Sequence, residues 1–376
     1  TFSAMTGAEV YLKYENQQKT GSFKVRGAYN KIMKRYAEGD LHAVVASSAG
    51  NHAQGVAFAA SSVGVKSTIV MPRSTPIAKV SATQGYGADV VLAGNIYDEA
   101  YAKACEICEA TGAEFIHPFD DEDVMAGQGT IALEILRDLP FVDMIFVPAG
   151  GGGLISGVAA CAKQINPRIQ IIGVQAEGAP AIANSFRAGE RKPSDSVHTI
   201  ADGIAVKTPG EKTFEYIQKY VDRVVTVSDD EIASAVLLLL ERCKQVVETS
   251  GAAPLAAVLN NKVDVKGKKV VCVLSGGNID VSFIHKIVEK GLITRCRQLK
   301  FSVLMPDAPG ALEHFSHIVA QQNANIILFQ HDRVQTDLEI GEAIIHVVCE
   351  VGGVDHAKRL IDTLGREGYR VFTSQI

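Results

Sequence analysis

Short apolar runs alternate along most of the chain with longer stretches in which apolar residues recur at helical spacing. Five runs have the length and composition of buried strands: residues 42–48, 66–72, 143–150, 169–176 and 268–277. The first run leads into "NHAQGVAFAASSVG" and the third into "LISGVAACAKQI", and both of these have the pattern of helices. Alternating strands and helices form βαβ units with a parallel sheet, and such proteins bind ligands at the carboxyl ends of strands. The pattern therefore predicts an α/β fold with a site in the loops that follow strands.

The pattern changes near Gly291. From there the chain reads as strand, helix, strand, strand, helix and strand, at residues 301–307, 309–323, 325–333, 340–351, 354–368 and 369–375. This βαββαβ order predicts a compact unit with its own sheet. We expect the boundary before it at about residues 291–299.

Two apolar segments could be mistaken for membrane spans. Residues 144–162 carry no charge, but Pro148 and four glycines interrupt them, and each glycine inside a continuous helix would cost about 1 kcal/mol. We interpret this segment as strand, loop and helix. Residues 229–248 contain four consecutive leucines, begin with acids and end with bases, which predicts a buried helix.

Composition narrows the class of partner. The 376 residues have a formal net charge of −5 and no basic cluster, which argues against nucleic acid or a membrane surface and favours a small molecule. We expect no export signal, and the seven scattered cysteines indicate reduced thiols in a cytoplasmic protein. Cys105 and Cys108 form a CxxC motif, but the surrounding pattern is that of an amphipathic helix, so we favour packing over metal or redox chemistry.

Three loops that follow predicted strands are rich in glycine or serine. In "VPAGGGGLISG" the glycines at residues 150–153 leave N–H groups uncovered beside a helix N-terminus, which suits a phosphate, although a tight turn explains them equally well. The spacing is not GxGxxG, yet Glu177 lies at a distance that leaves a nicotinamide enzyme open. "SSAGNHAQG" could bind a small carboxylate, and "LSGGN" places Ser275 at a strand end. Together the three loops indicate one site.

Lys24 is placed where a turn becomes a helix. Ser22 has the position of an N-cap, and the apolar residues that follow repeat at helical spacing: Val25, Tyr29, Ile32 and Tyr36. In the first turn the helix dipole disfavours a positive charge and lowers the pKa of the amine. A neutral amine attacks an aldehyde more readily, so Lys24 is a candidate nucleophile, the alternative being an ordinary solvated lysine.

Six segments, in this order, resemble a known family: "ENQQKTGSFKVRGA", "SSAGNHAQG", "PFDDEDVMAGQGT", "PAGGGGL", "ADGIAVK" and "LSGGNID". The resemblance covers residues 8–290 and is to the β-family (fold type II) pyridoxal-phosphate enzymes, most closely the threonine dehydratases, also called threonine ammonia-lyases. The C-terminal unit, with "MPDAPGAL", resembles an ACT domain. The resemblance implies a tryptophan synthase β-like catalytic domain of two parallel-sheet subdomains at residues 1–292, the smaller inserted at roughly 28–125, then a linker at 293–299 and an ACT domain at 300–376.

The resemblance also implies an activity, with pyridoxal 5'-phosphate as cofactor. L-Threonine would lose its β-hydroxyl and its amino group to give 2-oxobutanoate and ammonia, and L-serine would give pyruvate. Lys24 matches the lysine that forms the Schiff base and removes the α-proton. Ser275 matches a hydroxyl that faces the pyridine nitrogen, where it leaves that nitrogen largely neutral and favours prompt elimination.

Further roles follow from the same resemblance. The implied cofactor-binding residues are Phe23, Asn51 at the 3-oxygen, Gly150, Gly151, Gly152, Gly153 and Leu154 at the phosphate, and Gly203. The implied substrate residues are Ser48, Ala49, Gly50, Asn51 and His52 at the carboxylate, with Pro118 and Phe119 near the side chain.

Serine racemases share most of these motifs, so serine racemase and serine dehydratase are the near alternatives. Racemases carry a serine as acid where this chain has Ala49, which weighs against racemisation. Their metal site is matched at Glu177 but has Ala183 in place of a second carboxylate, so we expect at most a monovalent cation at Glu177.

The ACT resemblance implies control by an amino acid, isoleucine first and valine second. The matching effector residues are Asp307, Pro309, Gly310, Ala311, Leu312 and Asn325. His314 and His317 could suggest a metal, but a solvated helix face explains them better. A non-catalytic amino-acid sensor is a further alternative, which a lysine at position 24 disfavours. The family implies homotetramers or homodimers.

Overall fold

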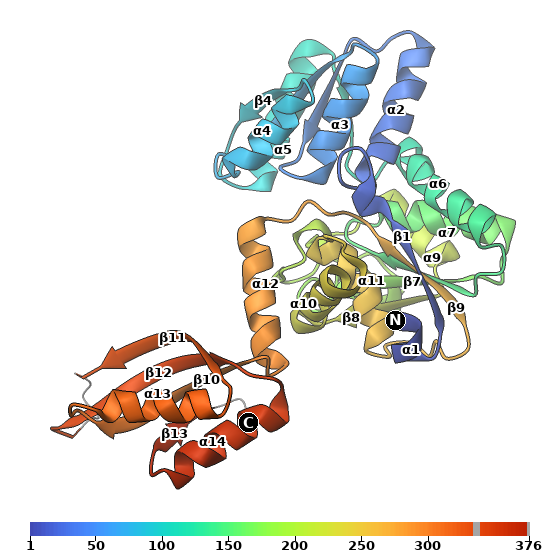
Figure 1. Ribbon diagram of the computed structural model, residues 1–376. Helices are drawn as coiled ribbons and strands as arrows, with labels where there is room; N and C mark the ends of the chain where they lie inside the picture. Colours follow the sequence, from blue (N-terminus) through green and yellow to red (C-terminus); the bar gives the residue numbers. More distant parts are fainter. Residues whose placement is uncertain (334–338, 374–376) are drawn as a thin grey trace. The chain divides into compact units, whose positions relative to one another are not determined.

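The computed structural model describes residues 1–333 and 339–373 and divides into two compact units, Thr1–Asp280 and Val281–Ile376 (Figure 1). Helix α12 (Val281–Thr294) packs on strand β10 of the second unit. The first unit therefore ends ahead of the boundary expected at residues 291–299.

A five-stranded parallel sheet forms the larger part of the first unit, in the order β1-β9-β6-β7-β8. Buried side chains of β6 pack with helices α6, α7 and α9 on one face, while α11 lies against the other face with α10 beside it (Figure 1). The strands are β1 (Glu9–Tyr14), β6 (Met144–Pro148), β7 (Gln170–Ala176), β8 (Arg223–Val227) and β9 (Lys269–Leu274). The helices are α6 (Glu122–Asp138), α7 (Gly153–Ile165), α9 (Glu211–Tyr220), α10 (Asp229–Leu238) and α11 (Thr249–Leu259), and this part of the unit also contains α1 (Phe2–Thr6), α8 (Ala181–Ala188) and the 3-10 turns η1 (Glu15–Gln17) and η2 (Asp202–Ile204).

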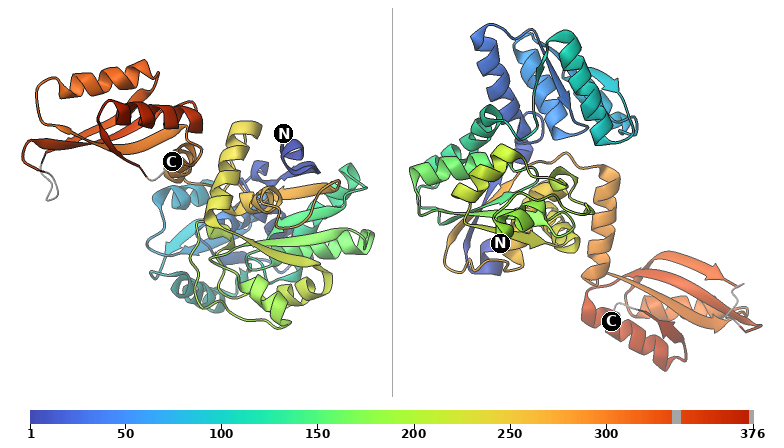
Figure 2. Two further views of the ribbon diagram at one scale, coloured as in Figure 1. Left: turned by 90° about the horizontal axis from the view of Figure 1, so that it is seen from below. Right: turned by 180° about the vertical axis from the view of Figure 1, so that it is seen from behind.

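A second parallel sheet, in the order β4-β3-β2-β5, forms a smaller subdomain within the same unit. Side chains of β2 alternate between two cores, with Val44 and Ala46 toward α3 and Val45 toward α5, so helices cover both faces. Helix α6 packs against both α2 and α7 and thereby joins the two subdomains, as Figure 2 also shows. The elements are β2 (Ala43–Ser47), β3 (Lys66–Met71), β4 (Asp89–Leu92), β5 (Glu114–Phe115), α2 (Lys24–Glu38), α3 (Asn51–Ser62), α4 (Ile77–Gly85) and α5 (Tyr97–Thr111).

The second unit has the βαββαβ order that the sequence predicts, built on an antiparallel sheet in the order β11-β12-β10-β13. Every second residue of β10 and β12 is buried, because helices α13 and α14 pack on that face. The topology is that of an ACT-like domain. Its elements are β10 (Gln298–Pro306), α13 (Ala311–Gln321), β11 (Asn325–Asp332), β12 (Glu342–Glu350), α14 (Val354–Arg366) and β13 (Arg370–Phe372).

The structure shows how the two apolar segments at residues 144–162 and 229–248 fold. Residues 144–162 form β6, a loop and part of α7, as expected. The helix expected over residues 229–248 is shorter: Ser228 and Glu231 form a capping box at its start, but α10 passes into a π-helical turn at Leu239–Cys243, and Lys244 has a φ of 57°. Within the described residues no helix is long and apolar enough to cross a membrane.

Candidate active site

Lys24 is the first residue of α2, and the segment before it is held by the end of β9. Phe23, not the expected Ser22, is the N-cap residue, because Ser22 forms a β-bridge with Gly276 and the Phe23 N–H donates to the carbonyl oxygen of Ser275 at 3.0 Å. This pairing places Lys24 directly beside the "LSGGN" loop.

The Lys24 amine is enclosed by protein. Its Nζ donates to the carbonyl oxygen of Pro118 at 2.6 Å and lies 5.2 Å from the centroid of the Phe23 ring. Burial lowers the pKa of this amine to about 8, partly opposed by the negative charge of Glu248. The sequence predicted a lowered pKa from the helix dipole; in the structure the pKa of Lys24 is lowered by burial.

The glycine loop lies against Phe119. A Cβ at Gly151 would come within 2.4 Å of the Phe119 ring, and a Cβ at Gly153 within 2.8 Å of the Phe119 Cα. Gly152 has a φ of 101°, which disfavours any other residue. In the described part of the chain, no hydrogen bond uses the N–H groups of Gly150, Gly151 or Gly152 as donors. The loop therefore packs closely on Phe119, and the N–H groups of Gly150, Gly151 and Gly152 point to no acceptor among the described residues.

The segment that carries Pro118 and Phe119 is pinned by two residues that the sequence analysis did not single out. His117 Nδ1 accepts the Phe119 and Asp120 N–H groups at 3.3 and 2.8 Å, and its ring stacks edge to face with Phe119 at 4.7 Å. The Asp120 carboxylate accepts the Glu211 N–H at 3.1 Å and the Thr213 N–H at 3.0 Å, at the start of α9.

Thr213 then closes this side of the site, because its Oγ1 donates to the Gly151 carbonyl oxygen at 2.7 Å. Lys24, the predicted substrate segment and the glycine loop thus form one connected arrangement. Leu154 follows the loop in the first turn of α7, where it is buried in the core of the larger sheet.

Asn51 is the first residue of α3. Its Nδ2 donates to both carboxylate oxygens of Glu248, at 3.0 and 2.9 Å. Its Oδ1 accepts the Asn278 Nδ2 at 2.7 Å. Glu248 and Asn278 bring the start of α11 and the loop after β9 to the site, and neither was named from the sequence.

The remaining loop residues surround Asn51. Ser48 Oγ accepts the Gly50 N–H at 3.2 Å, and Ala49 packs against the core of the smaller sheet. His52 is buried, and its Nε2 is 2.7 Å from the Ile116 carbonyl oxygen. Burial lowers the pKa of this imidazole to about 3, so it is neutral and donates that bond.

Gly203 and Ser275 are the last two of the expected cofactor-binding residues. Gly203 lies against Gly150, since a Cβ on Gly150 would be 3.1 Å from the Gly203 carbonyl oxygen. Ser275 is buried directly after β9. The residues expected at the cofactor ring, phosphate and pyridine nitrogen thus follow the parallel strands β2, β6 and β9, with Gly203 of η2 beside the glycine loop, and this arrangement fits pyridoxal phosphate.

Glu177 pairs with residues outside this arrangement. Glu177 Oε1 is 3.8 Å from Lys262 Nζ, which also lies 3.0 Å from Glu231. Among the residues described, no cluster of three or more His, Cys, Asp or Glu side chains could hold a metal ion. Cys105 and Cys108 lie in helix α5, as expected.

The structure separates the expected effector residues: residues 307–312 follow the end of β10, whereas Asn325 pairs with Glu350 at the opposite end of the sheet. Asp307 Oδ1 pairs with Arg333 Nε at 3.2 Å. The helix that follows starts after Gly310, which has a φ of 89°. Asn325 Nδ2 donates to Glu350 at 3.0 Å. Pro309 and Ala311 flank Gly310, and Leu312 is 42% exposed.

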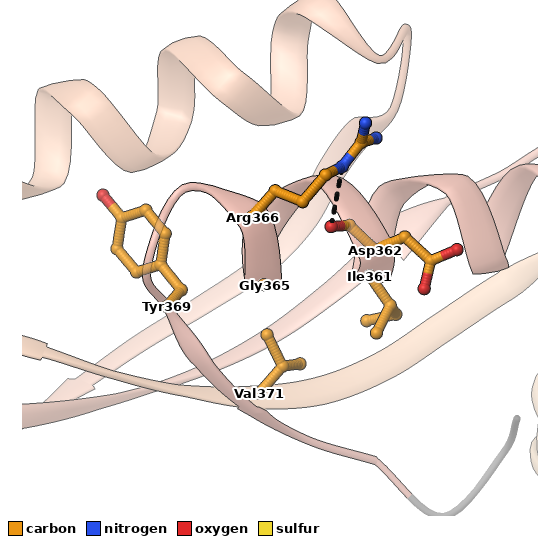
Figure 3. Close-up of a pocket in the computed structure, with 6 residues that line it drawn as sticks. All are labelled: Ile361, Asp362, Gly365, Arg366, Tyr369 and Val371. Atoms are coloured by element: carbon orange, nitrogen blue, oxygen red, sulfur yellow. Dashed lines mark hydrogen bonds between the residues drawn. The ribbon is translucent and has the colours of Figure 1, made fainter.

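A pocket elsewhere in this unit lies between α14 and β13 (Figure 3). Arg366 Nε donates to the Asp362 carbonyl oxygen at 3.3 Å beside it. The lining residues are Ile361, Asp362, Gly365, Arg366, Tyr369 and Val371, none of which belongs to the expected effector set.

The fold and the residues gathered around Lys24 define a pyridoxal-phosphate enzyme of the α/β class. A family model described as "Pyridoxal-phosphate dependent enzyme" matches residues 1–276, and the chain belongs to this family. Its cofactor is therefore pyridoxal phosphate.

The similarity to known proteins reaches both units in one case and most of the chain in two others. The L-threonine ammonia-lyase of Thermotoga maritima is 51% identical over 369 residues, which cover 98% of this chain and 92% of that protein. The solved structure of the processed form of threonine deaminase isoform 2 from Solanum lycopersicum is 42% identical with a TM-score of 0.74, covering 77% of this chain and 84% of that one. The structure of maize serine racemase is 38% identical with a TM-score of 0.73, covering 77% and 90%.

Proposed function

We propose that this protein is a threonine ammonia-lyase that converts L-threonine to 2-oxobutanoate and ammonia. The observation that carries the proposal is Lys24, a buried amine of lowered pKa that donates a hydrogen bond to the Pro118 carbonyl oxygen. The resemblance to proteins named L-threonine ammonia-lyase and threonine deaminase supports the choice of substrate.

Pyridoxal phosphate, when bound, withdraws electrons from the α-carbon of an amino acid. The N–H groups of the glycine loop, beside the N-terminus of α7, would bind its phosphate. Asn51 would orient the ring at the 3-oxygen, and the Ser275 hydroxyl would face the pyridine nitrogen. Lys24 Nζ would hold the cofactor and take the α-proton of the substrate.

The start of α3 would bind the substrate carboxylate. Ser48, Gly50 and the first N–H groups of α3 lie there, where the helix dipole favours a negative charge. Phe119, packed on the glycine loop, would border the substrate side chain. We expect L-serine to react as well, with a lower kcat/KM, because one methyl group is worth only about 1–3 kcal/mol of discrimination.

The experiment measures 2-oxobutanoate formed from L-threonine by the purified protein with its cofactor. We expect rapid formation in the native protein and in Lys103→Ala, which alters an exposed lysine of α5, and a loss of at least about a thousandfold in Lys24→Ala. A protein that binds the cofactor and yields no oxo acid from threonine or serine would contradict the proposal.

Serine racemisation is the second candidate, because maize serine racemase is among the similar structures. Ala49 argues against it, since a methyl group has no proton to give on the face of the substrate opposite Lys24. We expect no D-serine from L-serine in the native protein and a gain of racemisation in Ala49→Ser. Native D-serine formation that rivals pyruvate formation would favour the racemase.

Control by an amino acid belongs to the same proposal. The ACT-like topology of strands β10 to β13 supports a regulatory role, with isoleucine or valine as effector at Asp307 and Gly310, and with Asn325 completing the site from a neighbouring subunit. We further propose a homotetramer or homodimer, as is usual in the family. A monovalent cation at Glu177 would have to compete with the ammonium of Lys262.

A further inference from the structure

Glu248 is a buried carboxylate at the centre of the site, and nothing in the activity so far uses it. It is 5% exposed and precedes the first residue of α11, with its N–H donated to the Gly276 carbonyl oxygen at 2.9 Å. Among the described contacts its carboxylate makes no capping bond to its own helix. Burial of a carboxylate is costly unless its oxygens are engaged, so the contacts that it does make are informative.

The carboxylate fixes the direction of the Asn51 amide. Both Glu248 oxygens accept the Asn51 Nδ2, at 3.0 and 2.9 Å, while Asn278 donates to the Asn51 Oδ1 at 2.7 Å. A reversed amide would set the Asn51 nitrogen against the Asn278 nitrogen, although both are donors, and its oxygen against the Glu248 carboxylate, whose ionised form can only accept. Asn51 is therefore held with its nitrogen on the Glu248 side.

Close glycines show how tightly the carboxylate is placed. A Cβ on Gly276 would be 2.6 Å from Glu248 Oε1, and a Cβ on Gly203 would be 3.6 Å from the same atom. Gly276 directly follows Ser275. The carboxylate thus lies where the three loops that carry Asn51, Gly203 and Ser275 meet.

Charged groups face Glu248 from three elements: Lys24 on α2, Lys79 on α4 and Asp202 on η2. Burial raises the pKa of the Glu248 carboxyl to about 7, opposed by the hydrogen bond from Asn51 and by the two lysines, while Asp202 raises it further. In return, Glu248 is the group that opposes the lowered pKa of Lys24. Glu248 and Lys24 are therefore electrostatically linked.

We infer that Glu248 is a positioning residue of this site, whose carboxylate holds the Asn51 amide toward the cofactor and supplies the negative charge that balances the nitrogen of Lys24. The inference rests on the proposed site and deepens it. Two functions are separable in one side chain: an acceptor for Asn51, which glutamine partly retains, and a charge, which glutamine lacks.

The test compares Glu248→Gln, Glu248→Ala and the matched exposed control Glu109→Gln, each without amino-acid substrate. Cofactor affinity is measured by titrating the cofactor-free protein, and the pH midpoint by the visible absorption of the bound cofactor. We expect about tenfold weaker binding in Glu248→Ala and a smaller loss in Glu248→Gln, since one hydrogen bond to the amide remains. We expect the pH midpoint to fall by about one unit in both, because a nearby negative charge stabilises a cation.

Asn51→Ala separates the two functions. It should weaken cofactor binding while the pH midpoint stays within a few tenths of a unit of the native value. The double variant Asn51→Ala/Glu248→Ala should bind the cofactor no more weakly than Asn51→Ala, because the two residues act through one contact. Melting temperatures confirm that each variant folds. If Glu248→Ala does not fold, the pH midpoint of Glu248→Gln tests the inference alone.

A native pH midpoint and native affinity in Glu248→Gln, or additive losses in the double variant, would overturn the inference. Because no substrate is present, a protein that binds the cofactor but fails to deaminate threonine would refute the proposed function and leave this test intact.

Discussion

Two opposing electrostatic influences act on the amine of Lys24. Its surroundings exclude water and lower the pKa to about 8, while Glu248 favours the charged form. Because this pKa is close to neutral pH, a modest rise in pH converts the ammonium to the neutral amine, which is the nucleophile. The Pro118 carbonyl oxygen accepts a hydrogen bond from the amine in either state, so protonation changes the reactivity of Lys24 more than its position.

The first prediction concerns the rate at which the cofactor-free protein captures pyridoxal phosphate. Only the neutral amine attacks the aldehyde, so the second-order rate constant should rise about tenfold per pH unit below pH 8 and level off above it. Stopped-flow absorption at a series of pH values measures this. A curve that still rises to the ordinary lysine value of 10.5 would show that Lys24 is not perturbed.

Residues named from the sequence and residues missed by it differ in one physical respect. Lys24, the glycine loop and Ser275 lie in local motifs, where a turn and the start of a helix are encoded by neighbouring residues. Glu248 and His117 act through partners from distant segments, such as Asn51, which is 197 positions from Glu248. The available signal for Glu248 was a lone acid in the apolar stretch "VVETSGAAPLAAV".

Helix α2 is fixed to the larger sheet by a cluster of charges two residues past Lys24. Arg26 binds Glu15 through Nε at 2.7 Å and Nη2 at 2.9 Å, and binds Glu134 of α6 through Nη1 and Nη2, both at 2.7 Å. Arg26 in turn lowers the pKa of the Glu134 carboxyl to about 2. Because Glu15 follows β1 and is fully buried, this cluster sets where α2, and with it Lys24, begins.

The second prediction is that Glu15→Gln destabilises the protein. It leaves Arg26 buried with part of its charge unbalanced, which costs about 3 kcal/mol of unfolding free energy, seen as a lower urea midpoint at neutral pH. Glu38→Gln, which removes the exposed partner of Arg35, is the matched control and should change the midpoint little. Equal effects of the two substitutions would argue that the buried cluster contributes no more than a surface pair.

At the level of elements, hydrophobic pattern predicted the strands and helices better than their ends. The βαββαβ order and the five main strands are confirmed, because alternation and helical spacing extend over many residues. Ser22 failed as an N-cap, since pairing with Gly276 uses its backbone, and the helix expected to residue 248 ends in a π turn. Tertiary pairing determines such ends, and a local pattern does not contain it.

At the scale of the whole molecule, an effector in the second unit can act only by binding two states of the protein with different affinity. Such coupling typically amounts to about 1–3 kcal/mol, or about 5–150-fold in affinity, and it is reciprocal. If isoleucine alters the binding of threonine, threonine must alter the binding of isoleucine by the same factor. A limited factor that saturates as isoleucine is raised therefore distinguishes control through the second unit from competition at Lys24, where each ligand would exclude the other without limit.

The third prediction concerns the residues that bind the effector. Asp307→Ala removes the carboxylate that pairs with Arg333 in the proposed effector turn, so the response of threonine deamination to isoleucine should be lost while the rate without isoleucine is retained. Arg366→Ala, in the pocket between α14 and β13, is the control and should keep the response. Initial rates over a range of isoleucine concentrations measure both. If Arg366→Ala loses the response and Asp307→Ala keeps it, the effector binds in the pocket of Figure 3, and the match of residues 307–312 to an effector turn is wrong.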